Sequence, residues 1–150
     1  MIRSSHGLTL IEAAIALALA ATLFAVGIPA YERRVARAAV ADGVELAAPA
    51  KTLVEDYVAQ HDQLPSTEDI ALPFVTSRSV VGVSWVGAGR SGSIRVATQS
   101  ASGDDPALDG KVIVLTASYD PRTKRLAWAC GGDNGTSVPA PLLPAGCGGS

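Results

Sequence analysis

The stretch GLTLIEAAIALALAATLFAVGIPAY, residues 7–31, decides the fold, because it is too apolar for the surface of a soluble protein. The 21 residues from Leu8 to Ile28 contain a single charged side chain, Glu12. About 20 consecutive apolar residues form a helix long enough to cross the hydrocarbon core of a membrane. The stretch therefore predicts a membrane helix that begins only a few residues into the chain.

The rest of the chain has the size and composition of one modest globular domain. The chain has 150 residues, 12 basic and 14 acidic side chains and a formal net charge of −2. The basic residues are scattered, so the sequence offers no positively charged surface for a nucleic acid. One small cluster, Arg33, Arg34 and Arg37, follows the apolar run, where positive charge commonly flanks a membrane span or contacts anionic headgroups.

A helical pattern continues past the apolar run to about residue 60. Apolar residues recur at helical spacing on one side, and charged residues occupy the other side. The apolar side contains Val40, Val44, Ala47, Val54 and Val58. Pro29 and Pro49 each lack a backbone N–H and are expected to bend the helix. We therefore expect residues 8–31 to form a membrane segment and residues 32–150 to form a globular domain that begins with the helix continuation.

Four runs rich in β-branched and aromatic residues follow between residues 79 and 130. They cover residues 79–87, 93–98, 111–119 and 125–130, and turns rich in glycine, aspartate and proline separate them. Short strands joined by such turns are typical of an antiparallel sheet. The expected fold class is therefore α+β, with a long N-terminal α-helix packed on a four-stranded antiparallel sheet.

The two cysteines, Cys130 and Cys147, lie near the C-terminus. A single pair in a chain with a membrane segment indicates an exported disulfide rather than two free cytosolic thiols. Neither cysteine has a second cysteine or a histidine at the spacing of a zinc site. The bond would close 16 intervening residues into a loop. Such a closure stabilises a fold by roughly 3 kcal/mol in the chain-entropy model.

No pattern in the sequence indicates an enzyme or a cofactor site. Residues 87–92 match G-x-G-x-x-G, but a strand follows them, whereas dinucleotide binding requires a helix N-terminus at that point. His6 and His61 belong to no recognisable catalytic set. The acidic residues of 104–109 lack the regular spacing of a calcium loop. We therefore expect no catalytic residues, no cofactor and no metal site.

The hexapeptide Gly7-Leu8-Thr9-Leu10-Ile11-Glu12, followed by the apolar run, resembles the cleavage motif of type IV prepilins. The resemblance implies that a prepilin peptidase cuts after Gly7, which removes residues 1–7 as a leader peptide. It also implies that the new N-terminal residue, Leu8, is N-methylated. Glu12 then stands fifth in the mature chain, and residues 8–31 become a filament-core helix. A leader of seven residues is similar to those of the type IVa subclass.

The resemblance extends over the whole chain. Pro29 and Tyr31 stand where pilins commonly have proline and tyrosine, and the Cys130–Cys147 loop resembles the C-terminal disulfide-bounded region of pilins. The chain departs from the family pattern at Leu8, where most members have phenylalanine. It also departs at Ala21, where many major pilins have a glycine linked to local helix melting in the filament. Alanine favours helix, so melting is less expected here.

Glu12 requires a partner, because a charged side chain within a membrane costs about 2.5–3.5 kcal/mol on insertion scales. After cleavage Leu8 carries a free amine, and residues 8 and 12 lie on one helix face. Glu12 also lies in the first helical turn, where the helix dipole favours negative charge. We expect Glu12 to pair with the N-terminal amine of a neighbouring subunit and so to set the axial register of assembly.

The resemblance implies the structural subunit of a type IV pilus, a helical homo-oligomer that serves adhesion, twitching motility and DNA uptake. The implied partners are the prepilin peptidase, the pilus assembly machinery, the inner membrane before assembly, and DNA or a host surface. The implied location is the inner membrane and then the extracellular pilus of a Gram-negative bacterium. Asn134, in Asn134-Gly135-Thr136, and Ser150 are glycosylation candidates.

Two alternatives remain open at the level of sequence. Within the family, the chain could be a minor pilin or a type II secretion pseudopilin, and the cysteine loop and four-strand pattern favour a pilin. Outside the family, it could be a binding domain anchored by a single span. That alternative leaves Gly7 before the run, Glu12 within it and the helix continuing to about residue 60 without explanation.

Overall fold

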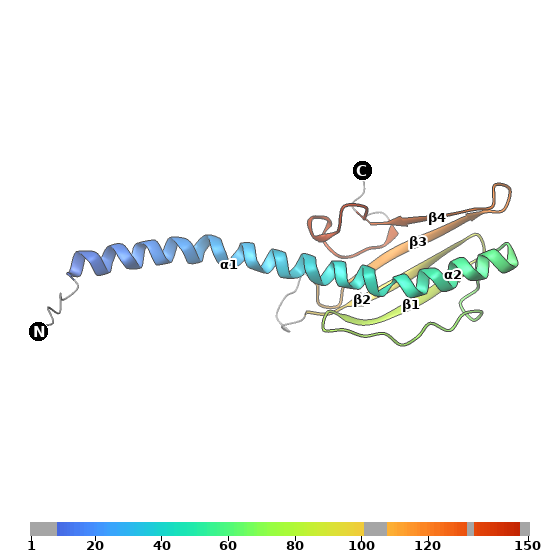
Figure 1. The fold of residues 1–150 in the computed structure, drawn as a ribbon, viewed down its shortest axis with the longest axis horizontal. Helices are drawn as coiled ribbons and strands as arrows, with labels where there is room; N and C mark the ends of the chain where they lie inside the picture. The colour runs from blue at the N-terminus through green and yellow to red at the C-terminus, as the bar shows by residue number, and fades with distance from the viewer. Residues whose placement is uncertain (1–8, 101–107, 132–133, 148–150) are drawn as a thin grey trace, which may run out of the picture. The chain divides into compact units, whose positions relative to one another are not determined.

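The computed structural model describes residues 9–100, 108–131 and 134–147, and the chain divides into two compact units, residues 1–35 and 36–150. In chain order the elements are α1 (Leu10–Leu46), α2 (Ala48–His61), β1 (Val80–Ala88), β2 (Ser91–Thr98), β3 (Val112–Asp120), β4 (Arg125–Cys130) and the short 3₁₀ helix η2 (Ala140–Leu142) (Figure 1).

The first unit consists of the N-terminal part of α1, whose large apolar side chains are exposed. Leu10, Leu17 and Leu23 each expose 71–89% of their surface. Among the described residues, one helical region, Leu10–His61, is long and apolar enough to cross a membrane, and its most apolar window has a mean hydropathy of 2.2. By length and composition, the predicted apolar helix is therefore present.

The helix predicted to continue to about residue 60 is divided in two. Ala47 separates α1 from α2, and its N–H bonds to the carbonyl of Val44, three residues earlier, over 3.2 Å. Pro49 lies in the first turn of α2, where a missing N–H leaves no helical bond unmade. The helix ends at Asp62, which takes a left-handed conformation with φ of 53°. The interruption therefore comes just before the proline.

The four strands form one antiparallel sheet in the order β1-β2-β3-β4. Gly89, with φ of 66°, makes the tight turn between β1 and β2, so the G-x-G-x-x-G pattern is a hairpin. Strand β4 pairs only with the second half of β3, from Leu115 opposite Cys130 to Asp120 opposite Arg125. The beginning of β3 consequently has no strand on that side.

One face of the sheet packs against α1 from Ala36 onward and against α2, and this interface is the core. Its fully buried members include Val40, Val54, Val80, Ile94, Val96 and Ile113. Gly43 of α1 lies directly over this core, since a Cβ there would be in contact, at 3.4 Å, with Ile113 Cδ1 and with Val96 Cγ1. The expected fold, a long helix on a four-stranded antiparallel sheet with a C-terminal disulfide, is confirmed.

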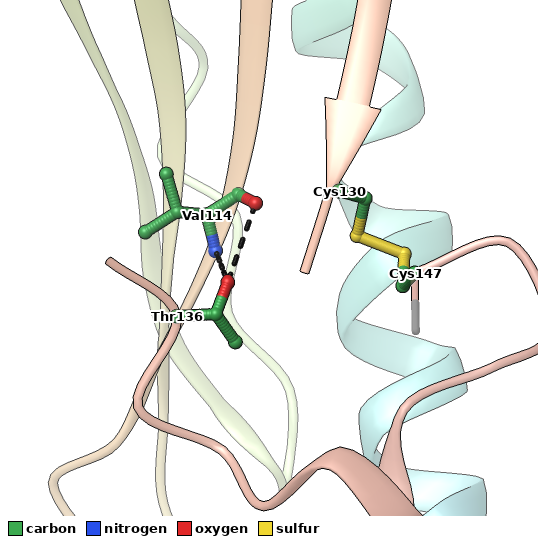
Figure 2. Close-up of a disulfide and its surroundings, with 4 residues drawn as sticks. All are labelled: Val114, Cys130, Thr136 and Cys147. Carbon is green, nitrogen blue, oxygen red and sulfur yellow. Dashed lines mark hydrogen bonds between the residues drawn. A yellow bond between two sulfur atoms is a disulfide. The ribbon is translucent and has the colours of Figure 1, made fainter. Parts of the chain in front are cut away.

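The C-terminal loop covers the part of β3 that β4 leaves unpaired. The N–H of Val114 donates to Thr136 Oγ1 over 3.0 Å, and the N–H of Val112 donates to Ser137 Oγ over 2.8 Å. The disulfide Cys130–Cys147 joins the end of β4 to the end of the loop (Figure 2). Arg37 Nε also donates to the carbonyl of Pro141 over 3.0 Å. The loop is thus held to both the sheet and α1.

Candidate functional site

The N-terminus of α1 is closed by a reciprocal pair of contacts between Thr9 and Glu12. Glu12 Oε2 accepts the backbone N–H of Thr9 over 3.0 Å and its hydroxyl over 2.8 Å. The N–H of Glu12 lies 3.4 Å from Thr9 Oγ1, which accepts from it. This arrangement is a capping box, in which the residue before the helix and the third helical residue satisfy each other's free N–H groups.

The capping box gives Glu12 a role within its own chain that our sequence reasoning missed. The local signal was present, because Thr9-Leu10-Ile11-Glu12 fits the S/T-x-x-E pattern before an apolar run. The carboxylate is thereby held at the positive end of the helix dipole. Gly7 and Leu8, at the expected cleavage point, lie outside the described residues, as does Ser150.

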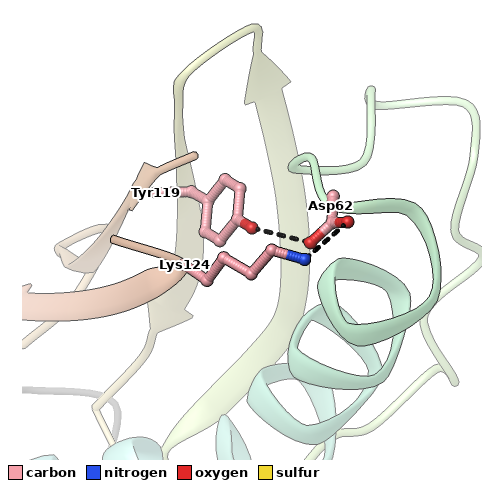
Figure 3. A network of polar contacts seen from close by, with 3 residues as sticks. All are labelled: Asp62, Tyr119 and Lys124. Atoms are coloured by element: carbon pink, nitrogen blue, oxygen red, sulfur yellow. Dashed lines mark hydrogen bonds and ion pairs between the residues drawn. The ribbon is translucent and has the colours of Figure 1, made fainter. Parts of the chain in front are cut away.

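A polar cluster ties the end of α2 to the turn between β3 and β4 (Figure 3). Asp62 Oδ1 accepts the Tyr119 hydroxyl over 3.1 Å, and Asp62 Oδ2 accepts Lys124 Nζ over 3.2 Å. The hydrogen bond from Lys124, then that from Tyr119, then the positive charge of Lys124 hold the pKa of Asp62 below its usual 3.8. These contacts join the end of α2 to the β3–β4 turn, which is far away in sequence.

A groove of about 340 Å³ lies beside the disulfide. Its lining is mostly apolar and includes Val44, Leu115, Trp128, Pro144 and the two cysteines, with Lys51 as the charged member. Lys51 Nζ lies 5.1 Å from the centroid of the Trp128 ring, and Trp128 Nε1 donates to Glu55 Oε1 over 3.0 Å. The tryptophan ring is therefore held in place from two sides.

The remaining sequence candidates are not gathered into one site. Asn134 is exposed, while the Thr136 hydroxyl of the same tripeptide contacts the backbone of Val114. Pro29 lies within α1. Most of the acidic segment 104–109 falls outside the described residues, and within the described part of the chain no three metal-ligating side chains gather.

Comparison with known families identifies the fold. A family model described as Pilin (bacterial filament) matches residues 36–148, which is nearly the whole of the second unit. The chain belongs to the pilin family. Pilins are structural filament subunits, so this pilin is a building block of a filament and not an enzyme.

Curated relatives identify the branch of the family. The chain is 30% identical over 125 residues to the "Type IV major pilin protein PilE" of Neisseria gonorrhoeae, covering 83% of this chain and 73% of the relative. A "Fimbrial protein" of Neisseria meningitidis serogroup A is 30% identical over 125 residues, with coverage of 83% and 72%. "Fimbrial protein EcpC" of Eikenella corrodens is 29% identical over 143 residues, with coverage of 94% and 89%. This pilin is therefore a type IV pilin. No solved structure gives a significant match.

Proposed function

We propose that this pilin is made as a precursor, cut after Gly7, N-methylated at Leu8 and assembled as the main subunit of a surface pilus. The observation that carries the proposal is the exposed apolar part of α1, up to Ile28, with one acid, Glu12, held in its first turn by Thr9. A subunit anchored in a membrane and later packed among sister helices needs both features. The apolar helix keeps the precursor in the bilayer. The Glu12 carboxylate places a negative charge where the N-terminal amine of an added subunit can pair with it.

The proposed role of Glu12 is to pair with the N-terminal amine of an adjacent subunit. The capping box supports this role, because it already orients the carboxylate toward the N-terminal end of the helix. In an apolar filament core the amine and the carboxylate would each be costly alone, and pairing them offsets both costs. A newly added subunit would then be stable at the axial position where the two groups meet.

The proposed pilus serves surface adhesion, twitching motility and DNA uptake of a Gram-negative bacterium. The names of the relatives, a type IV major pilin and two fimbrial proteins, support a surface filament. The proposal includes a prepilin peptidase, an assembly machinery driven by separate ATPases, and residence of the precursor in the inner membrane. Its binding targets would be a host surface and DNA.

The deciding experiment is N-terminal analysis of filaments sheared from cells that express the full chain. We expect the mature chain to begin with N-methylated Leu8. A chain that begins at Met1 would contradict processing and would favour a domain anchored by a single span. We also expect this chain to be the most abundant protein of the sheared material. A trace amount would identify it instead as a minor pilin or a secretion pseudopilin.

Two variants of Glu12 separate its charge from its cap. Glu12→Gln keeps an oxygen acceptor for Thr9, since glutamine also serves in capping boxes, but it removes the charge. We expect Glu12→Gln and Glu12→Ala to be cleaved and both to enter filaments poorly, because neither can neutralise an amine. If Glu12→Gln assembles like the unmodified chain while Glu12→Ala does not, the cap matters and the charge pair does not.

A further inference from the structure

Phe74 is a solvent-exposed aromatic side chain. The protein that carries it belongs to a family whose members assemble with one another. Phe74 exposes 89% of its surface, more than any other large apolar side chain described in residues 36–150. The segment that carries it is fastened on both sides. Pro65 accepts the indole N–H of Trp85 over 3.2 Å, and the N–H of Ser77 donates to the Val80 carbonyl over 2.9 Å. Phe74 is therefore presented by a segment anchored at both ends.

The groove beside the disulfide has the complementary chemistry. Its walls are mostly apolar, and one of them is the Trp128 ring. Lys51, at its border, lies over that ring, whereas the one ion pair among the described residues joins Lys124 to Asp62. The groove therefore offers apolar and aromatic surface together with a cation that has no carboxylate partner in the described part of the chain.

The segment that carries Phe74 and the groove lie at opposite edges of the same sheet. The segment before β1 contacts the outer edge of that strand, because Thr67 Oγ1 accepts the N–H of Gly87 over 3.1 Å. The groove is bordered by Trp128 and Cys130 of β4, the strand at the other edge. Figure 1 shows the segment 62–79 along β1 and the C-terminal loop beyond the end of β4. Within one molecule, the segment of Phe74 therefore does not reach the groove, and the two surfaces remain available to other molecules.

We propose that Phe74 of one pilin subunit inserts into the disulfide-side groove of the next subunit in the filament. The occupant is a second copy of this chain. The segment of Phe74 and the groove lie at opposite edges of one sheet, and pilin subunits assemble with one another. A contact between two different surfaces of identical subunits is head-to-tail and repeats without closing, as a filament requires. Charge supports the same pairing, since Glu68 is exposed on the segment of Phe74 and Lys51 borders the groove.

The contact is tested by placing the photo-crosslinker p-benzoylphenylalanine at position 74 of the full chain and illuminating sheared filaments. We expect cross-linked dimers in which position 74 is joined to Trp128 or to residues 144–147 of another subunit. Filaments whose cross-links from position 74 all lie elsewhere, or that give no dimer, overturn the contact and leave the proposed pilus intact. Absence of filaments from the unmodified chain overturns both.

Substitutions supply an independent measurement. Truncation of a central aromatic anchor weakens a contact by about tenfold or more, so we expect Phe74→Ser to lower the yield of sheared filaments by that factor. The urea midpoint of the subunit should stay unchanged, because Phe74 is exposed. Val86→Ser is the matched control, since Val86 is also exposed but lies on the outer face of β1. Assembly of Phe74→Ser at the unmodified level overturns the proposal.

Charge reversal tests whether Lys51 of one subunit lies close to Glu68 of the neighbouring subunit. We expect Lys51→Glu and Glu68→Lys each to reduce filament yield a few-fold, and the double variant to recover most of the loss, because the charges are exchanged between neighbouring subunits. A double variant no better than the worse single variant overturns the assignment of Lys51 and Glu68 to one contact.

Discussion

The Tyr119 hydroxyl donates a hydrogen bond to Asp62 Oδ1 over 3.1 Å, which joins β3 to the residue that ends α2. The same carboxylate receives Lys124 Nζ from the following turn. Asp62 therefore has two structural roles at once. It adopts the left-handed conformation that terminates the helix, and its carboxylate fastens that helix end to the sheet.

The contacts of Asp62 with Tyr119 and Lys124 predict a specific loss of stability in acid. A carboxylate whose folded pKa is lowered stabilises the fold above its usual pKa of 3.8, and this contribution disappears as the pH falls through the lower folded value. Asp62→Asn should therefore lower the urea midpoint at about pH 7, and this difference should shrink as the pH falls below 3.8 and through the lower folded pKa of Asp62, because the carboxylate then becomes protonated in the folded chain. Asparagine tolerates the left-handed conformation, so the comparison isolates the charge.

Asp56→Asn is the control for that series, since Asp56 is an exposed aspartate of α2 with no hydrogen bond to its side chain in the described structure. Its urea midpoint should follow that of the unmodified chain at every pH. If the difference between Asp62→Asn and the unmodified chain stays constant with pH, the lowered pKa of Asp62 is not a source of stability.

The disulfide should contribute a large part of the stability of the globular unit. Cys130 and Cys147 are 17 positions apart, and closing a loop of that length is worth roughly 3 kcal/mol in the chain-entropy model. We expect the double variant Cys130→Ser, Cys147→Ser to lose about that much free energy of unfolding in detergent. Chemical reduction of the unmodified chain should give the same loss, and a cost below about 1 kcal/mol would contradict the prediction.

Hydrogen exchange should locate the effect of that double variant. The N–H groups of Val112 and Val114 donate to Ser137 and Thr136 of the loop, not to another strand. Freeing the loop should therefore accelerate exchange at Val112 and Val114 far more than at Ile94, which lies in the central strand β2. Equal acceleration at all three amides would mean that the loop does not protect the edge of β3.

Gly43 should accept alanine but no larger side chain. A Cβ at this position would lie 3.4 Å from Ile113 Cδ1 and 3.5 Å from Val80 Cγ2, which is ordinary contact. Alanine favours the helix by about 0.5–1 kcal/mol over glycine, so Gly43→Ala should leave the free energy of unfolding unchanged or raise it by that amount. Gly43→Leu should lower it by about 1–3 kcal/mol, because the helix must move off the sheet. If Gly43→Ala lowered the free energy of unfolding, the packing of α1 on the sheet at this position would have to be tighter than described.

Gly92 should tolerate no side chain. A Cβ there would overlap the ring of Trp85, which is buried and donates its indole N–H to Pro65. We expect Gly92→Ala to cost about 1–3 kcal/mol and to expose Trp85. A Trp128→Phe background makes Trp85 the sole tryptophan, so its fluorescence reports the change. Gly82→Ala is the control, because a Cβ at Gly82 meets nothing within 4 Å, and an equal cost there would contradict the steric explanation.

Local patterns were sufficient for most elements of this fold, although not for the division of the long helix at Ala47. The apolar run gave the N-terminal helix, β-branched runs bounded by turns gave the four strands, and the cysteine pair gave the loop. Each of these depends on residues close in sequence or on a bond with few possible partners. The capping box of Thr9 and Glu12 is also local, since it depends only on their spacing of three residues.

The amino-acid sequence by itself determined which segments are helix and strand and where the single acid lies, because periodicity and propensity act over neighbouring residues. The tertiary structure alone decided that Asp62 meets Tyr119, that Thr136 covers β3, and that the segment of Phe74 and the groove lie at opposite edges of the sheet. These relationships depend on strand order and register, which bring together residues tens of positions apart. No local pattern records which distant residues will become neighbours.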